Sequence, residues 1–121
     1  MINVKINRTY DLEDRTAKFG ESIILFCKKI TVMDINRPLI NQLIRSSTSI
    51  GANYCEADDA ESKKDFIHKI GICKKEARET KHWLRMLAVV MPESTNTIRD
   101  LWVEAKELNL IFNAIINSCK K

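Results

Sequence analysis

Residues 62–92 read SKKDFIHKIGICKKEARETKHWLRMLAVVMP, and this stretch decides the fold. Its apolar or small residues recur at alternating spacings of three and four, the period at which one face of an α-helix packs against other helices. Eight positions form this row: Phe66, Ile70, Cys73, Ala77, Thr80, Leu84, Leu87 and Met91. Ser62 can cap the helix with Asp65 at the third position, and Pro92 ends it. The stretch predicts a helix over residues 63–91.

The same spacing occurs in three more rows on either side of this stretch. These rows are Leu12, Thr16, Phe19, Ile23, Phe26, Ile30 and Met33; Ile40, Leu43, Ser47, Ile50, Tyr54 and Ala57; and Ile98, Leu101, Ala105, Leu108, Phe112, Ile115 and Cys119. We expect helices at roughly 11–33, 37–59, 63–91 and 95–119. Because the connections are short, consecutive helices should be antiparallel neighbours. The predicted fold is all-α, an antiparallel up-down-up-down four-helix bundle.

Length and composition predict one domain over residues 1–121. Three glycines and two prolines are too few for a fold of many strands and turns. Residues 1–8 alternate Ile2, Val4 and Ile6 with polar residues. This alternation is typical of a short strand that pairs with a partner chain, or of a frayed tail.

The sequence predicts a cytoplasmic protein without a membrane partner. The N-terminus lacks the apolar core of a signal peptide, and no apolar run reaches the length of a membrane span. The four cysteines, at positions 27, 55, 73 and 119, are widely separated and form no Cys-x-x-Cys pair. We therefore interpret them as free thiols on helix faces, not as zinc ligands.

Positive charge is concentrated in the third predicted helix. Between Ser62 and Met86 there are eight Lys or Arg residues and three acidic ones, a net charge of +5 in a chain whose total is +4. One acid-free stripe lies opposite the predicted core row: Lys64, His68, Gly71, Lys75, Arg78, His82 and Arg85. It is either a solvated face or a surface that binds the phosphate backbone of DNA or RNA through Lys64, Lys75, Arg78, His82 and Arg85. No aromatic residue is interleaved with the stripe, which favours backbone binding over base stacking.

Four polar residues flank the core rows at i,i+3 spacing: Asn53, Glu56, Glu76 and Glu79. We interpret them as an interhelical polar network, with Arg45, Arg78 or Arg85 as partners of the carboxylates. The alternative is a metal site, because Glu79-x-x-His82 matches the motif of di-iron bundles. Such sites need the motif on two helices, whereas the second histidine, His68, is on the same helix as the first. We therefore predict no metal and no cofactor.

No catalytic residues are predicted. Ser46, Ser47 and Ser49 lie within a predicted helix without a histidine nearby in the sequence, and the chain has no glycine-rich phosphate loop. The fourth helix instead suggests assembly. Val103 and Leu110 are seven residues apart on the face opposite the core row, with Trp102 beside them. An apolar pair at this spacing is typical of a subunit contact, so these three residues predict a homo-oligomer interface.

Residues 43–87 resemble a known bacterial family, the four-helix-bundle proteins encoded by intervening sequences in 23S rRNA. The matching pieces are Arg45-Ser46, Ser49-Ile50-Gly51-Ala52-Asn53, Glu56-Ala57, Lys64-Asp65-Phe66-Ile67, Lys75-Glu76-Ala77-Arg78-Glu79-Thr80 and Trp83-Leu84-Arg85, with a weaker echo in Glu104-Ala105-Lys106-Glu107-Leu108. The chain departs from the family pattern at Cys55 and Cys73. The resemblance implies an antiparallel bundle that assembles as a homopentameric ring without enzymatic activity. It also implies kinship with the basic, ring-shaped accessory protein of diversity-generating retroelements, which binds nucleic acid and a reverse transcriptase.

Two functions are consistent with these patterns. The first is a non-enzymatic oligomeric scaffold that binds nucleic acid through a basic face. The second is a protein-interaction module, such as an accessory subunit of a polymerase or reverse transcriptase, without direct nucleic-acid binding. The sequence does not decide between a stand-alone family member and a retroelement accessory protein.

Overall fold

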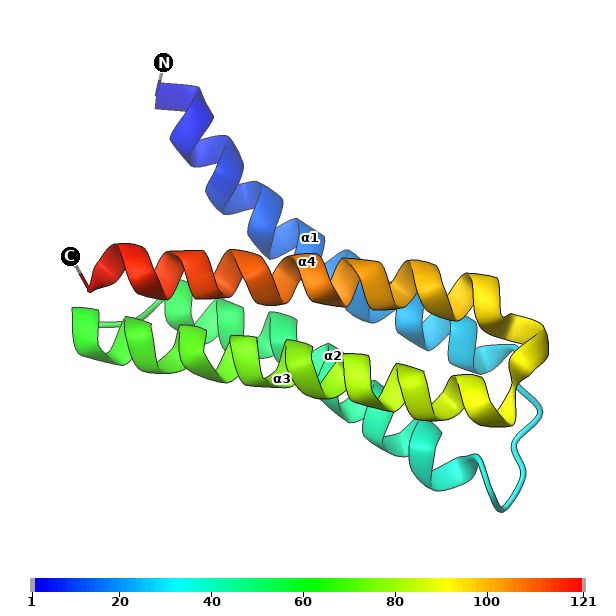
Figure 1. Cartoon of the computed structure of the whole chain (residues 1–121). Helices are drawn as coiled ribbons and strands as arrows, with labels where there is room; N and C mark the ends of the chain where they lie inside the picture. Colours follow the sequence, from blue (N-terminus) through cyan, green and yellow to red (C-terminus); the bar gives the residue numbers. More distant parts are fainter. Residues whose placement is uncertain (1, 121) are drawn as a thin grey trace.

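The computed structural model describes residues 2–120 and the side chains of residues 12–120. These residues form four α-helices: α1 (Ile2–Lys28), α2 (Arg37–Asp58), α3 (Lys63–Val90) and α4 (Thr95–Cys119). A short 3-10 helix, η1 (Pro92–Ser94), precedes α4. Consecutive helices run in opposite directions along the bundle (Figure 1). The all-α fold predicted from the sequence is confirmed.

The first helix differs from its expected bounds of 11–33. It begins at Ile2, so the strand or tail expected at residues 1–8 is wrong over residues 2–8, and Met1 is outside the described residues. It ends at Lys28, and the next two backbone N–H groups, of Lys29 and Ile30, donate to the carbonyls of Phe26 and Cys27 three residues back, which tightens the last turn.

Asn36 holds the connection between α1 and α2 in place. Its side chain is fully buried; Oδ1 accepts a hydrogen bond from the Met33 backbone N–H at 2.7 Å, and Nδ2 donates to the Thr31 carbonyl at 3.2 Å. Met33, expected in the core, lies in this loop and is 47% exposed.

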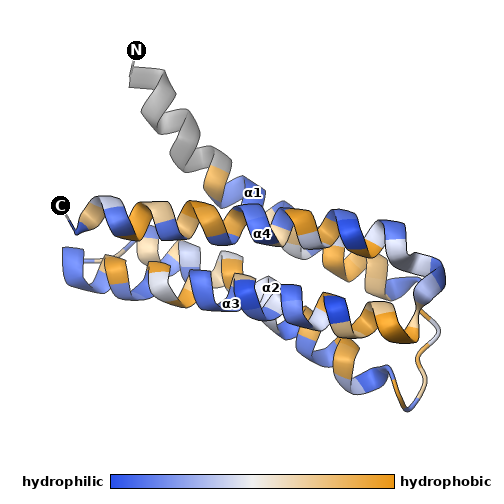
Figure 2. Cartoon of the chain, viewed as in Figure 1, coloured by the Kyte–Doolittle hydropathy of each residue, from blue (hydrophilic) through white to orange (hydrophobic). Residues whose placement is uncertain are grey.

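The interior is built from the four rows of apolar and small residues. Ile23, Leu43, Ile50, Ile70, Leu84, Leu87, Leu108 and Phe112 are the largest apolar side chains that are completely buried. The three polar members of the rows are also buried: Thr16, Ser47 and Thr80. Thr80 Oγ1 lies within hydrogen-bond distance of the Glu76 carbonyl of its own helix, at 2.8 Å, and of Ser46 Oγ of α2, at 2.9 Å. Apolar residues gather where the helices face one another (Figure 2).

The position of α3 matters most for function. Ser62 caps it by accepting a hydrogen bond from the Asp65 backbone N–H at 3.0 Å, and the helix ends at Val90, just before Met91 and Pro92. The helix packs against α2 on one flank and α4 on the other, so one face is left toward solvent. Within the described part of the chain, no helix is long and apolar enough to span a membrane.

Candidate nucleic-acid interface

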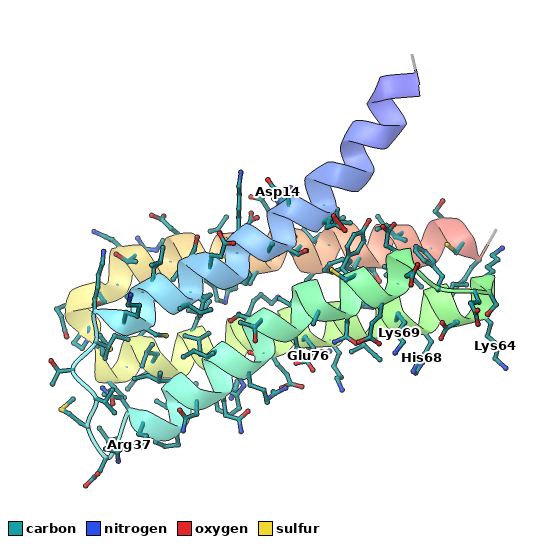
Figure 3. The ribbon with its side chains drawn as sticks, turned by 180° about the vertical axis from the view of Figure 1, so that it is seen from behind. Asp14, Arg37, Lys64, His68, Lys69 and Glu76 are labelled. Carbon is teal, nitrogen blue, oxygen red and sulfur yellow. The ribbon has the colours of Figure 1, made fainter. Side chains whose placement is uncertain are left out.

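The outer face of α3 presents the basic stripe predicted from the sequence. Lys64, Lys75, Arg78, His82 and Arg85 are all exposed there. Figure 3 shows Lys64 and His68 pointing away from the bundle along the edge of α3. The stripe follows from helix geometry, because residues three and four apart lie on one side of a helix.

The cations of this stripe lack carboxylate partners. Among the described side chains, no ion pair or hydrogen bond is formed by Lys64, Lys75, Arg78 or Arg85. His82 makes an edge-on contact with the Trp83 ring, with 4.9 Å between ring centroids. The four Lys and Arg side chains are therefore available to an anionic ligand.

The three remaining cations of α3 from Lys69 to Lys81 contact side chains of α2 or α4. Lys69 Nζ lies 2.6 Å from Glu56 Oε1 of α2, and this hydrogen bond and the carboxylate charge raise the lysine pKa. Lys74 Nζ donates to Asn113 Oδ1 of α4 at 2.8 Å. Lys81 Nζ lies 5.5 Å from the centroid of the Trp102 ring. All three lysines are partly buried, in contrast to the exposed stripe.

Arg45 of α2 binds the two carboxylates of α3 that lie beside the stripe. Its guanidinium is 3.2 Å from Glu76 Oε1 and 2.5 Å from Glu79 Oε1. Glu76 is buried, and Figure 3 places it on the side of α3 that faces α2. Of the three expected arginine partners, Arg45 is brought to the carboxylates, whereas Arg78 and Arg85 are not. The pairing draws both carboxylates toward α2 and away from the outer face.

Asn53 and Glu56 do not join this group. Asn53 Nδ2 donates to the Ser49 carbonyl at 2.8 Å, a bond within α2 and not between helices. Glu56 does bridge helices, but to Lys69. The expected network of four residues is thus two separate interhelical ion-pair groups plus a local hydrogen bond.

The residues expected at an oligomer interface divide into two groups. Val103 and Leu110 are 41% and 56% exposed on the outer face of α4. Trp102 is only partly exposed and packs against the core. Since one residue turns a helix by about 100°, Trp102 is directed toward α3, where Lys81 meets it. An aromatic ring therefore lies at the edge of the basic region, which the sequence of α3 alone did not indicate.

A third interhelical ion-pair group was missed in the sequence. Arg15 of α1 contacts Glu104 at 2.7 Å and Glu107 at 2.9 Å, both on α4. The hydrogen bond with Glu104 is the main cause of a raised Arg15 pKa. Nothing in the spacing along the chain points to this pair, because 89 residues separate Arg15 from Glu104.

The side chains considered for metal binding and catalysis are engaged elsewhere. Glu79 binds Arg45, and His82 contacts Trp83. Within the described residues, no three His, Cys, Asp or Glu side chains come together as metal ligands would. The hydroxyls of Ser46, Ser47 and Ser49 donate to carbonyls of their own helix at 3.3, 3.3 and 2.7 Å.

The cysteines are free thiols in unequal environments. Burial raises the pKa of Cys27 to about 11 and that of Cys73 to about 12, so few of these thiols are ionised at neutral pH. Cys55 is exposed and Cys119 is partly exposed.

Comparisons with known proteins identify the family of the chain. Residues 8–114 match the model of the 23S rRNA-intervening sequence protein family. A solved structure from Bacteroides thetaiotaomicron VPI-5482, of a protein of unknown function from the S23 ribosomal protein family, superposes with a TM-score of 0.82. It is 31% identical in sequence, and the match covers 90% of this chain and 97% of that one. No curated protein matches the sequence. The chain belongs to the 23S rRNA-intervening sequence protein family.

Proposed function

We propose that this protein is a non-enzymatic, oligomeric scaffold that binds the backbone of DNA or RNA through the outer face of α3. The observation that carries the proposal is the division of the α3 cations. Lys69, Lys74 and Lys81 have partners within the bundle, whereas Lys64, Lys75, Arg78 and Arg85 have none among the described side chains.

Phosphate binding explains this division better than solvation alone. Surface cations are commonly paired or interspersed with acids, and like charges along one helix face repel. Here Arg45 holds Glu76 and Glu79 on the α2 side. The outer face therefore has a single sign of charge, and a phosphate backbone is the anion that matches a row of cations in register with a helix.

Assembly is needed to make this binding strong. One stripe offers about four phosphate contacts, too few for tight binding alone at cellular salt. Repeating the stripe around a ring links several weak sites, which raises the overall affinity without any new contact. The exposed Leu110 on the outer face of α4 supports a subunit contact, and the family resemblance suggests five copies.

A protein partner is the second candidate function, and the α1–α2 loop favours it. Val32, Met33 and Ile35 of this loop are 50%, 47% and 66% exposed. Three large apolar side chains exposed on one loop are typical of an interaction surface. On this alternative, the ring presents apolar loops to a partner such as a polymerase, and the basic stripe is only solvated.

Charge reversal on α3 tests the first function. The variant Lys75→Glu with Arg78→Glu should lose nucleic-acid binding, because two unpaired cations of the stripe become anions. The measurement is fluorescence anisotropy with labelled DNA and RNA at low and at physiological salt. Binding of the unaltered protein should tolerate sequence changes and weaken steeply as salt rises.

A matched variant controls for net charge. Lys28→Glu with Lys29→Glu changes the total charge equally, but at exposed residues at the end of α1. It should retain most of the affinity. Equal losses of affinity in both double variants would show that only the overall charge matters. If the unaltered protein binds no nucleic acid at low salt, the protein-interaction function is favoured instead.

A further inference from the structure

A shallow groove lies between α3 and α4 at the end of the basic stripe. Its volume is about 530 Å³, and Arg85, Ala88, Ile98, Arg99, Trp102 and Val103 line it, together with Thr95. The floor and walls are mainly apolar, and two arginines are the charged members. No acidic residue lines this groove.

Four cations lie either beside the Trp102 ring or in the lining of the groove. Lys81 of α3 and Lys106 of α4 place their ammonium groups 5.5 and 5.7 Å from the centroid of the Trp102 ring. Arg85 and Arg99 line the same groove. The acids of this part of α4 are directed elsewhere: Glu104 binds Arg15 of α1, and Asp100 lines a different pocket with Arg15. The surroundings of Trp102 are thus cationic around an aromatic ring.

The groove continues the basic stripe. Each residue turns an α-helix by about 100°, so the ten residues from Lys75 to Arg85 end about 80° short of three full turns. Arg85 therefore lies to one side of Lys75 on the helix, and its place in the lining of the groove shows that this side faces α4. Arg85 is therefore both the last cation of the stripe and a wall of the groove.

We infer that this groove binds one unpaired nucleotide of a single strand whose backbone follows the stripe, an inference that rests on the nucleic-acid binding proposed above. The base lies against the Trp102 ring, and the flanking phosphates are bound by Arg85 and Arg99. Lys81 and Lys106 have flexible stems, so their ammonium groups can transfer from the ring to a phosphate as the base arrives.

The chemistry of the groove selects single strands over duplexes. An apolar recess with an aromatic ring recognises the face of a base, which is free in a single strand and already stacked in a duplex. The stripe alone recognises phosphates of either form. The groove therefore adds affinity for single strands without adding affinity for duplexes of the same sequence.

Tryptophan fluorescence gives a direct test. The chain has two tryptophans, Trp83 and Trp102, so Trp83→Phe leaves the groove residue as the only one. Adding single-stranded DNA or RNA to this variant should quench its fluorescence over the same concentration range in which the anisotropy of the labelled strand rises. Duplex should bind with little quenching.

Substitution of Trp102 supplies the second arm. Trp102→Leu should weaken single-strand binding roughly tenfold, the ratio expected for loss of one stacking contact, and change duplex binding less than about twofold. Trp102→Phe retains a ring and should keep most of the single-strand preference. Circular dichroism of both variants confirms that they are compared in the folded state.

The outcomes separate this inference from the proposed function. If the unaltered protein binds both forms but Trp102→Leu affects them equally or not at all, backbone binding stands and the nucleotide groove is wrong. If Trp102→Leu lowers the oligomer mass while single-strand affinity per assembled copy is unchanged, the groove is a subunit contact and the inference is overturned. If neither strand binds the unaltered protein, both proposals fail.

Discussion

Cationic side chains have different partners on the two flanks of α3. On the flank that faces α2, cations meet carboxylates: Arg45 binds Glu76 and Glu79, and Lys69 binds Glu56. On the flank that faces α4, cations meet uncharged groups. Lys74 donates to the Asn113 amide, and Lys81 lies over the Trp102 ring.

This difference explains which sides of α3 carry uncompensated positive charge. Ion pairing on the α2 side removes the acids of α3 from its outer face, while the amide and indole groups of α4 leave lysine charge uncompensated. The field of α3 is therefore directed outward and toward α4, the side on which Arg85, Arg99 and Lys106 are also found. The ion pairs on one flank and the cationic surface on the other, which we propose binds anions, are two consequences of one distribution of charge.

The largest effect on stability should come from breaking the α2 flank. Arg45→Met keeps the length of the side chain and leaves the buried Glu76 carboxylate without its cation. We expect the free energy of unfolding to fall by about 2–3 kcal/mol, less than for a fully buried pair because the Arg45 side chain is partly exposed. Urea denaturation followed by circular dichroism measures this change.

Arg37→Met is the matched control for Arg45→Met. Among the described side chains, Arg37 pairs with the fully exposed Asp34 alone, at 2.9 Å, and such surface pairs contribute about 0–1 kcal/mol. Equal stabilities of the two variants would show that the Arg45 pairs hold the helices together no better than a surface pair.

The outer face of α4 differs from that of α3, since it carries the exposed apolar residues Val103 and Leu110 among its polar ones. Leu110→Glu should dissociate the assembly, because a carboxylate in a subunit contact costs about 2 kcal/mol or more. The subunit should stay folded, since Leu110 is 56% exposed. Light scattering on a sizing column should give a mass several times the 14.0 kDa chain before the change and a lower one after it.

Ile35→Glu is the control for the assembly. It adds the same charge to an apolar residue that is 66% exposed, in the α1–α2 loop rather than on α4. The mass should not change. If the unaltered protein is a monomer at micromolar concentration, the assembly proposal is wrong. If Ile35→Glu lowers the mass of the assembly and Leu110→Glu does not, the subunit contact lies at the loop and not on α4.

The smallest effect is expected on the α4 flank. Lys81→Met removes a cation as Arg45→Met does, but leaves no buried charge behind. The contact of an ammonium with a ring near the surface contributes about 0.5–1 kcal/mol, and the methionine retains packing against Trp102. Urea denaturation should show a loss well below that of Arg45→Met; a larger loss would reverse the ranking of the two flanks.

The helical rows could be predicted from the sequence because they depend on local spacing alone. Each of the four rows contributes buried residues to the interior, and the exposure of Lys64, Lys75, Arg78 and Arg85 follows from the same periodicity. Periodicity did not reveal where α1 ends, because Ile30 and Met33 continue the row beyond the helix. The buried Asn36 side chain, which organises that loop, gives no periodic signal.

The partners of the charged residues could not be predicted in the same way. Arg45 was one of the candidate partners for Glu76 and Glu79. That Arg45 and not Arg78 pairs with them depends on how α2 and α3 are rotated against each other. The Arg15–Glu104 pair and the Lys81–Trp102 contact join helices through packing, so side-chain geometry in three dimensions decides them. The groove at Trp102 also depends on this packing and could not be predicted from the sequence.

The division between paired and unpaired cations of α3 is tested most directly by the salt dependence of nucleic-acid affinity in two single variants. Lys75→Gln neutralises an unpaired cation of the stripe, and Lys69→Gln neutralises the cation paired with Glu56. For each variant, the logarithm of the binding constant is plotted against the logarithm of the salt concentration. In Lys75→Gln the magnitude of the slope should fall by about 1 for each subunit that contacts the strand, whereas in Lys69→Gln the slope should stay the same. Equal slopes in the two variants, whether both reduced or both unchanged, would contradict the division.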